Sequence, residues 1–255
     1  MYTLTLTTDF GNSLFPAILK GVLLKINPSL KIITISNSIE KFNIHQAKFI
    51  IKNSYHYFPE KTIHLCVVDP GVGSERKGII VKTEKYFFVG PDNGIFSFLK
   101  ENDILEIYEI NYKPENCSAT FHARDIFAPV CGFISLNRKF EYFSKKIPIK
   151  KTFTFTNDFF EDRFKVIFID DFGNIFLNIK KDEFFELTKG KNFELNFKGK
   201  VFKKLHNSYS EVKKGELLLL INSFNYLEIA VREGNAKEIL NAKVGDRYEI
   251  KTYNS

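Results

Sequence analysis

Acidic residues stand directly after apolar, strand-like runs at four places in the chain. They are Asp9 in TTDFGN, Asp69 in VVDPGVGSER, Asp92 in VGPDNG and the pair Asp170–Asp171 in FIDDFGN. Ligand sites of α/β proteins gather at the carboxyl ends of sheet strands, where a carboxylate can bind a ligand or accept a proton. Each motif alone also fits an ordinary turn, because Asp, Asn, Gly and Pro are turn formers. We interpret PDNG as such a turn.

A histidine adds a second kind of chemistry. His122 lies in TFHARDIFAP, just before a helical stretch, and an imidazole can hold or pass a proton near neutral pH. The residues after it, Arg124 and Asp125, also fit a simple helix start, since acidic residues are favoured in a first helical turn.

Metal, nucleotide-loop and serine-hydrolase chemistry have little support. The acidic residues and His122 could coordinate a metal ion, but no two stand at a close ligand spacing such as HxH or HExxH, and we expect no metal. The chain has no P-loop, no GxGxxG after a strand and no GxSxG. Its cysteines, Cys66, Cys117 and Cys131, match no metal or redox spacing. We interpret them as free thiols of a cytoplasmic protein.

Composition narrows the class further. The chain has 255 residues, of which 44% are hydrophobic, enough for one large or two moderate cores. No apolar run reaches the length of a membrane span, and the N-terminus MYTLTLTTDFG lacks the pattern of a signal peptide. The formal charge of +7 comes from scattered lysines. We therefore favour a solvated basic surface over nucleic-acid binding.

The elements that must position these residues alternate between strands and helices in the first half. Strands are expected at 3–8, 31–36, 62–68 and 104–110, a hairpin at 78–90, and helices at 14–26, 43–57, 95–102 and 123–137. This alternation predicts an N-terminal α/β domain over residues 1–140, with a central, mostly parallel sheet.

The second half changes character. Residues 141–162 are rich in Lys, Phe and Thr with weak periodicity, and we expect a linker there. Strand signals punctuated by Gly and Asn dominate afterwards, which predicts a smaller all-β domain over residues 163–255, in the form of a barrel.

Taken together and in this order, the motifs resemble one family. The strings TDFG (8–11), KGVLLKINP (20–28), VVDPGVGSER (67–76), GPDNG (90–94), TFHARDIFAP (120–129), DDFGN (170–174) and NSFNYLEIAV (222–231) are similar to those of the S-adenosylmethionine hydroxide adenosyltransferases, also called S-adenosyl-L-methionine hydrolases. These are relatives of the bacterial fluorinase and chlorinase. The resemblance implies hydrolysis of S-adenosyl-L-methionine (SAM) to adenosine and methionine without a cofactor. It also implies a homotrimer with active sites at subunit interfaces.

The resemblance also implies roles for individual residues. The catalytic set around the attacking water would be Asp69, Arg76 and His122. The halogenating relatives carry other residues at the Asp and His positions, so this set favours water over halide. The substrate-binding residues implied in the same way are Asp9, Phe42, Phe121, Asp170, Asn174, Tyr209, Ser223, Glu228 and Val231.

Three positions depart from the family pattern. Leu14 stands near a place that is usually acidic, Ala123 replaces the glycine of TFHGRD, and Asn225 replaces a glycine in NSxGxLEIA. Asn still tolerates the left-handed backbone that such a glycine adopts. Two alternatives stay open beside the hydrolase: a SAM-dependent halogenase, and a protein that binds adenosine or SAM without turnover.

Overall fold

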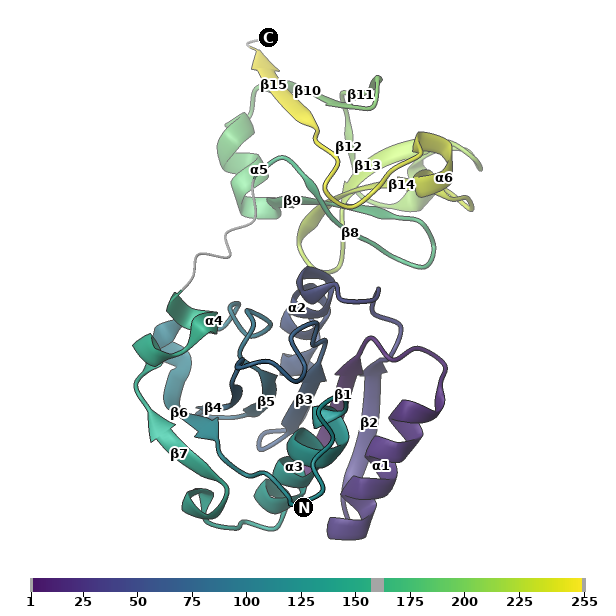
Figure 1. Cartoon of the computed structure of the whole chain (residues 1–255). Coiled ribbons are helices and arrows are strands. Elements are labelled where there is room, and N and C mark those ends of the chain that lie inside the picture. The colour runs from purple at the N-terminus through teal and green to yellow at the C-terminus, as the bar shows by residue number, and fades with distance from the viewer. Residues whose placement is uncertain (1, 157–162, 254–255) are drawn as a thin grey trace. The chain divides into compact units, whose positions relative to one another are not determined.

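A computed structural model describes residues 2–156 and 163–253 of the chain (Figure 1). The chain folds as two compact units, Met1–Phe159 and Phe160–Ser255. The first combines helices with a large sheet, and the second consists mainly of strands. The fold is therefore a mixed α/β fold with several sheets.

A seven-stranded sheet forms the middle of the N-terminal unit. Its strands, in the spatial order β2-β1-β3-β5-β4-β6-β7, are β2 (Lys31–Ser36), β1 (Thr3–Thr8), β3 (Ile63–Val67), β5 (Phe87–Pro91), β4 (Gly78–Thr83), β6 (Ile104–Ile110) and β7 (Ser144–Ile147). The pairs β1–β2, β1–β3 and β3–β5 are parallel, whereas β4–β5, β4–β6 and β6–β7 are antiparallel. The sheet was predicted to be mostly parallel, but only its β2-β1-β3-β5 half is parallel. The β4–β5 hairpin, itself foreseen, reverses the strand direction there because a tight turn can join only antiparallel strands.

Helices cover both faces of this sheet. The side chains of Leu4 and Leu6 in β1 pack with α1 (Leu14–Ile26) and α3 (Ala128–Ser135), which Figure 1 shows on the same side. Cys66 in β3 points to the opposite side, where it packs with α2 (Ile44–Lys52). Successive strand residues alternate between faces, so two separate cores form on one sheet. The carboxyl ends of β1 and β3 lie side by side, because these strands pair in parallel.

The segment expected as a linker contains regular structure. Within 141–156 the chain forms β7, which pairs with β6, a 3₁₀ turn at Ile149–Lys151, and the short helix α4 (Phe153–Thr156). Strand β7 was missed because only its end residues, Ser144 and Ile147, are buried, so SKKI gives almost no apolar signal. Residues 157–162 of the expected linker lie outside the described residues. The helix expected at 95–102 is also wrong: a turn occupies 94–99, and only Glu101–Asp103 forms a 3₁₀ turn.

The C-terminal unit contains two sheets around one core. Strands β12 (Leu205–His206), β13 (Leu217–Ile221), β14 (Tyr226–Val231), β9 (Ile175–Lys180) and β8 (Val166–Ile169) form one sheet. Strands β11 (Lys200–Phe202), β10 (Asn192–Phe197) and β15 (Glu249–Tyr253) form the other. A bridge between Lys165 and Arg247 connects them. A barrel was predicted for this unit, but the described strands do not close into one.

Two helices interrupt these strands, so the unit is not all-β. They are α5 (Lys181–Thr188) and α6 (Ala236–Leu240). Helix α5 begins where the Glu183 carboxylate accepts from the Lys180 amide (2.8 Å), and α6 begins where the Asn235 side chain accepts from the Glu238 amide (3.0 Å). Such caps stabilise short helices in a strand-rich context. Across the described ranges, no helix has the length and apolarity needed to cross a membrane.

Candidate active site

Three side chains far apart in the sequence meet in the N-terminal unit. Arg76 donates from Nε to Asp69 Oδ1 (2.9 Å) and from Nη2 to Asp69 Oδ2, and the same Nη2 lies 2.9 Å from His122 Nδ1. Asp69 follows β3, Arg76 precedes β4, and His122 directly precedes a π-helical turn, η3 (Ala123–Phe127). The structure therefore brings together the three residues predicted as catalytic.

The loop between β3 and β4 is shaped by its glycines. Gly73 has φ +81°, and a Cβ atom at this position would lie 2.6 Å from the Ala119 carbonyl oxygen. Ser74 Oγ donates to the Gly71 carbonyl (2.7 Å) and accepts from the Arg76 amide (3.2 Å). This turn packs against the backbone three residues before His122, so the loop and the histidine segment approach closely only because position 73 has no side chain.

The contact with Arg76 determines which form of His122 is present. A guanidinium has only N–H donors, so His122 Nδ1 must accept and the ring proton must lie on Nε2. Burial lowers the pKa of His122 below its usual 6.5, and the Arg76 charge lowers it further, against the opposing effects of Asp69 and Asp125. The imidazole is consequently neutral at neutral pH and offers an Nε2–H donor.

A cavity of about 250 Å³ lies beside this cluster. It is lined by Asp9, Phe10, Phe15, Lys41, Phe42, Val67, Asp69, Val72, Thr120, Phe121, His122 and Ala123. Five of the six residues predicted as site residues in this unit line it directly. The sixth, Arg76, lies behind Asp69 and His122 and stacks 5.2 Å from the centre of the Phe127 ring.

Asp9 supplies the cavity with a second carboxylate. It follows β1, is only 6% exposed, and its Oδ2 accepts from the Phe42 amide (3.0 Å), while Lys41 Nζ donates to its carbonyl oxygen. Within the described part of the chain, Asp9 Oδ1 has no hydrogen-bond partner and is available to a ligand hydroxyl.

Aromatic side chains form one wall of the cavity. Phe121 packs edge-on against Phe10 and Phe15, with ring centres 5.9 and 5.1 Å apart. Phe42 is 66% exposed and sits at φ +65°, an unusual conformation for a bulky residue. An apolar wall facing carboxylates suits a ligand with both a flat ring and hydroxyl groups.

Lys41, Phe10 and Phe15 are lining residues that sequence reasoning missed, and no spacing or composition signal distinguished them. Of the departures from the family pattern, Ala123 lines the cavity, whereas Leu14 is exposed at the start of α1 and does not. Asn225 adopts φ +62°, which confirms that it takes the left-handed backbone expected of a glycine.

The residues predicted as substrate contacts in the C-terminal unit gather at two places. Asp170 shapes the turn between β8 and β9, where it accepts from the Phe172 amide (3.0 Å), the Asn174 amide (2.9 Å) and Asn174 Nδ2 (2.9 Å). In β14, Glu228 is only 2% exposed and accepts from the Tyr209 hydroxyl (2.8 Å).

Burial raises the pKa of both partners in the Tyr209–Glu228 pair. The Asp170 charge also raises the pKa of each, so the two places are electrostatically coupled. Ser223 is exposed in the turn after β13, and the Val231 side chain is buried at the end of β14.

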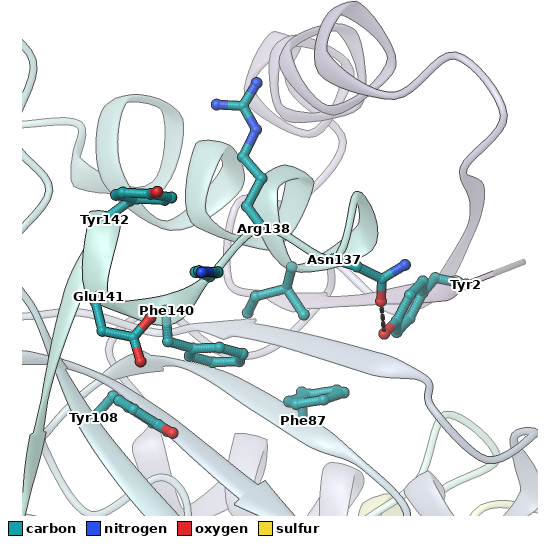
Figure 2. Close-up of a pocket in the computed structure, with 10 residues that line it drawn as sticks. Tyr2, Phe87, Tyr108, Asn137, Arg138, Phe140, Glu141 and Tyr142 are labelled. Carbon is teal, nitrogen blue, oxygen red and sulfur yellow. Dashed lines mark hydrogen bonds between the residues drawn. The ribbon is translucent and has the colours of Figure 1, made fainter.

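A larger hollow, of about 710 Å³, lies at the opposite end of the N-terminal sheet (Figure 2). Tyr2 precedes β1 and Phe87 begins β5, whereas Asp9 follows the far end of β1. Its rings stack on one another, with centres 6.1 Å apart for Phe87–Phe140 and 4.6 Å for Tyr108–Phe140, and Tyr2 donates to Asn137 Oδ1 (2.7 Å). These lining side chains thus contact each other. The hollow also lies away from the carboxyl ends of the parallel strands, where ligand sites of α/β proteins gather.

The smaller cavity thus combines two carboxylates, an imidazole and an aromatic wall, a set that can hold a small polar molecule beside a hydroxylated ligand. Among residues 2–156 and 163–253, no three His, Cys, Asp or Glu side chains are grouped as a bound metal ion would require. The N-terminal domain of the SAM hydroxide adenosyltransferases matches residues 4–144, and the C-terminal domain matches residues 164–249. The chain belongs to the SAM hydroxide adenosyltransferase family.

Individual relatives agree with this membership. A Methanocaldococcus jannaschii protein named (R)-S-adenosyl-L-methionine hydrolase is 39% identical, over 97% of this chain and 95% of its own. A solved structure from Thermotoga maritima is 33% identical with a TM-score of 0.85, over 98% of this chain and all of its own. A Nocardia brasiliensis fluorinase is more distant, at 20% identity over 91% of this chain and 90% of its own. The chain is thus more similar in sequence to that hydrolase than to that fluorinase.

Proposed function

We propose that the protein hydrolyses S-adenosyl-L-methionine to adenosine and L-methionine, with water attacking the ribose C5′ carbon. The observation that carries this proposal is the contact of Arg76 with both Asp69 and His122, beside a cavity that Asp9 also lines. The name of the Methanocaldococcus jannaschii relative, an (R)-S-adenosyl-L-methionine hydrolase, supports the same activity.

The leaving group departs without help from an acid in the site. The C5′–S bond breaks with its electron pair on sulfur, which turns a sulfonium cation into a neutral thioether, so no acid has to protonate it. The water oxygen forms the new bond to C5′ and must lose one proton. The protein therefore has to orient the water and accept that proton.

Asp69 is the proposed acceptor of the proton. A positioned base contributes roughly 10²–10⁴-fold to a rate. Arg76 holds the carboxylate through two N–H donors, and the Nε2–H of neutral His122 is the proposed donor that orients the water. Holding water in line with the C–S bond, about 3–3.5 Å from carbon, removes much of the entropic barrier.

The remaining predicted residues are proposed to hold the substrate. Asp9 would accept from the ribose hydroxyls, and hydrogen bonds to a charged group are worth about 1.5–3 kcal/mol each. Phe42 and Phe121 would pack on the ribose or purine. In the C-terminal unit, the proposed contacts are Asp170 or Glu228 for the methionine ammonium and Tyr209 for adenine, together with Asn174, Ser223 and the Val231 backbone.

We propose a homotrimer with active sites at subunit interfaces, in the cytoplasm, that acts without a cofactor and binds neither nucleic acid nor membrane. Light scattering should then give three times the 29.6 kDa mass of the chain.

The hydrolase proposal is tested by incubating the pure protein with SAM and following adenosine by chromatography. Adenosine and methionine should appear in equal amounts, and a heat-inactivated sample is the control. Asp69→Ala should abolish most of the rate while leaving the fold intact. Tight SAM binding without adenosine would instead identify a binding protein.

The sulfonium configuration is a separate question, because the relative's name specifies the (R) form. We propose that this chain also prefers (R)-SAM. A mixture of both sulfonium epimers should lose the (R) form first on a column that resolves them. Preferential loss of the (S) form would contradict this preference.

A halide-using transferase is the second candidate, favoured only by the similarity to the fluorinase. Asp69 and His122 argue against it, since a base and a water-orienting donor have no role when the nucleophile is an anion without a proton. A 5′-halo product formed in the presence of chloride or fluoride would favour this candidate.

A further inference from the structure

The pair that follows His122 has contacts that a simple helix start does not require. Arg124 donates from Nε to Asp125 Oδ1 (2.6 Å) and from Nη2 to Asp125 Oδ2 (2.8 Å). Adjacent residues on a regular α-helix do not face each other. Here both lie in the π-helical turn η3, in which the Ala128 amide donates to the Ala123 carbonyl five residues back.

Each member of the pair also reaches back to the segment that lines the cavity. Asp125 Oδ2 accepts from the Ser118 amide (2.8 Å), and Ser118 Oγ accepts in turn from the Thr120 amide (3.2 Å). The Arg124 guanidinium lies 5.1 Å from the centre of the Phe121 ring. Phe121 is thereby held between this cation and the rings of Phe10 and Phe15.

These contacts connect the residues just before His122 with the residues just after it. The Phe121 carbonyl accepts from the amides of Arg124 (3.1 Å) and Asp125 (3.2 Å), so the backbone around His122 forms one tight turn. Thr120, Phe121 and His122 all line the cavity, whereas neither member of the pair does. The pair can therefore act on a ligand only through these neighbours.

We propose that Arg124 and Asp125 are positioning residues, which hold Phe121 and His122 in the orientation that the reaction needs. The inference rests on the proposed hydrolase function for its kinetic test, but the orientation of His122 can be measured without turnover. Asp125 is largely buried and Arg124 is partly exposed, so the pair is anchored more firmly than an ion pair on the open surface.

The kinetic test uses Arg124→Gln, Arg124→Lys and Asp125→Asn, assayed as folded enzyme well below each variant's melting temperature. We expect kcat to fall about tenfold to a hundredfold in each, with a smaller change in KM, because a misplaced group slows the chemical step. Lysine should not rescue Arg124, since an ammonium group lacks the planar fork that binds both carboxylate oxygens. The matched control is Lys82→Gln, which removes the Lys82–Glu106 ion pair, of similar exposure, between β4 and β6 of the same unit and should leave kcat unchanged.

A double-mutant comparison separates positioning from stabilisation. In a His122→Asn background, Arg124→Gln and Asp125→Asn should lower kcat by a smaller factor than in the wild type, because His122, one of the two residues that they position, is gone. Full additivity with His122→Asn, or an unchanged kcat combined with a lower melting temperature, would overturn the proposal and leave the pair as a helix start.

The second readout is nitrogen NMR of the histidine rings at pH 7.5, with His122 assigned by the signals that vanish in His122→Asn. The wild type should show His122 with its proton on Nε2, and Asp125→Asn should shift these signals whereas Lys82→Gln should not. If the wild type releases no adenosine, the proposed function fails, and the NMR comparison alone decides the positioning role. Unchanged His122 signals in Asp125→Asn would then overturn it.

Discussion

At the scale of single residues, one nitrogen of Arg76 serves two partners, since Nη2 donates to Asp69 and contacts His122 Nδ1. A lysine at this position would keep the charge but not the fork. We expect Arg76→Lys to lower kcat/KM by about 10²-fold, because a small displacement of reacting groups has an effect of that size. Steady-state assays alongside circular dichroism check this. Near-wild-type kinetics would show that the charge alone is sufficient.

The neutral form of His122 determines the acid side of the pH profile. Burial and the Arg76 charge lower its pKa, so the imidazole stays unprotonated until the pH falls below 6.5. Protonation of His122 Nδ1 would place its N–H donor against the N–H donor of Arg76 Nη2, and the contact between the two residues would break. We expect kcat/KM to be constant from pH 8 to 6.5 and to decline only at lower pH. A decline that begins above pH 6.5 would contradict the Nε2–H form.

A second histidine affects stability instead of catalysis. His64 in β3 is fully buried among aromatic rings, its Nδ1 contacts Thr5 Oγ1 (2.7 Å), and burial lowers its pKa to about 3. The unfolded chain binds a proton at this residue below about pH 6.5, but the folded chain does not until about pH 3. The free energy of unfolding should therefore fall with decreasing pH across this window, by up to about 1.4 kcal/mol per pH unit.

This pH effect is checked by urea unfolding of the wild type and His64→Gln at pH 7, 6 and 5. The variant should be less stable at pH 7 but should lose stability less steeply on acidification, since its side chain does not titrate. Parallel curves for the two proteins would exclude His64 as the origin.

At the scale of elements, the loop from Asp69 to Arg76 depends on Gly73, whose φ is +81° and whose missing side chain leaves room for the Ala119 carbonyl. Gly199 has nearly the same φ, +79°, but open space around it. Left-handed backbone costs an L-residue about 1–2 kcal/mol, so both Gly→Ala variants should be destabilised. Only Gly73→Ala should also lower kcat, because only there must the loop move away from Ala119, in the segment that leads to His122. Equal kcat values for Gly73→Ala and Gly199→Ala would refute this.

The strands and helices of the first half were predictable because their signals are local. TLTLTT and KIITIS formed β1 and β2 where expected, and the hairpin at 78–90 was correct. Helix α5 was missed because its KDEFFELT sequence is strongly charged, and β7 was missed because SKKI gives almost no apolar signal. The pairing of β7 with β6 and the π-helical turn after His122 give no recognisable pattern in a single sequence.

At the scale of the whole molecule, the motifs singled out the three residues proposed as catalytic, but the contact between these residues depends on long-range packing. Arg76 and the turn at Gly73 connect Asp69 to the His122 segment, and no periodicity reveals this connection. The cavity wall was harder to predict, since Phe10 and Phe15 are two of 28 phenylalanines and nothing in the pattern separates them from core residues. The roles of the site residues in both units remain predictions.

The proposed trimer leads to a test by complementation. Asp69→Ala and Glu228→Gln should each be nearly inactive alone, since one lacks the base and the other a proposed substrate contact. If active sites form between subunits, co-expression of the two variants should restore part of the activity, because some interfaces then combine two intact surfaces. No recovery in mixed assemblies shown by mass to contain both variants would contradict shared sites.

The π-helical turn at Ala123–Phe127 amounts to an ordinary helix carrying one surplus residue. Excising that residue would let α3 continue without interruption toward its N-terminus, with a gain in regular hydrogen bonding. Everything upstream would then rotate by about 100° around the helix axis, so the imidazole would leave the cavity. The surplus residue thus sets the angle at which His122 faces the cavity. A variant without it should have a more regular and more stable helix but no activity.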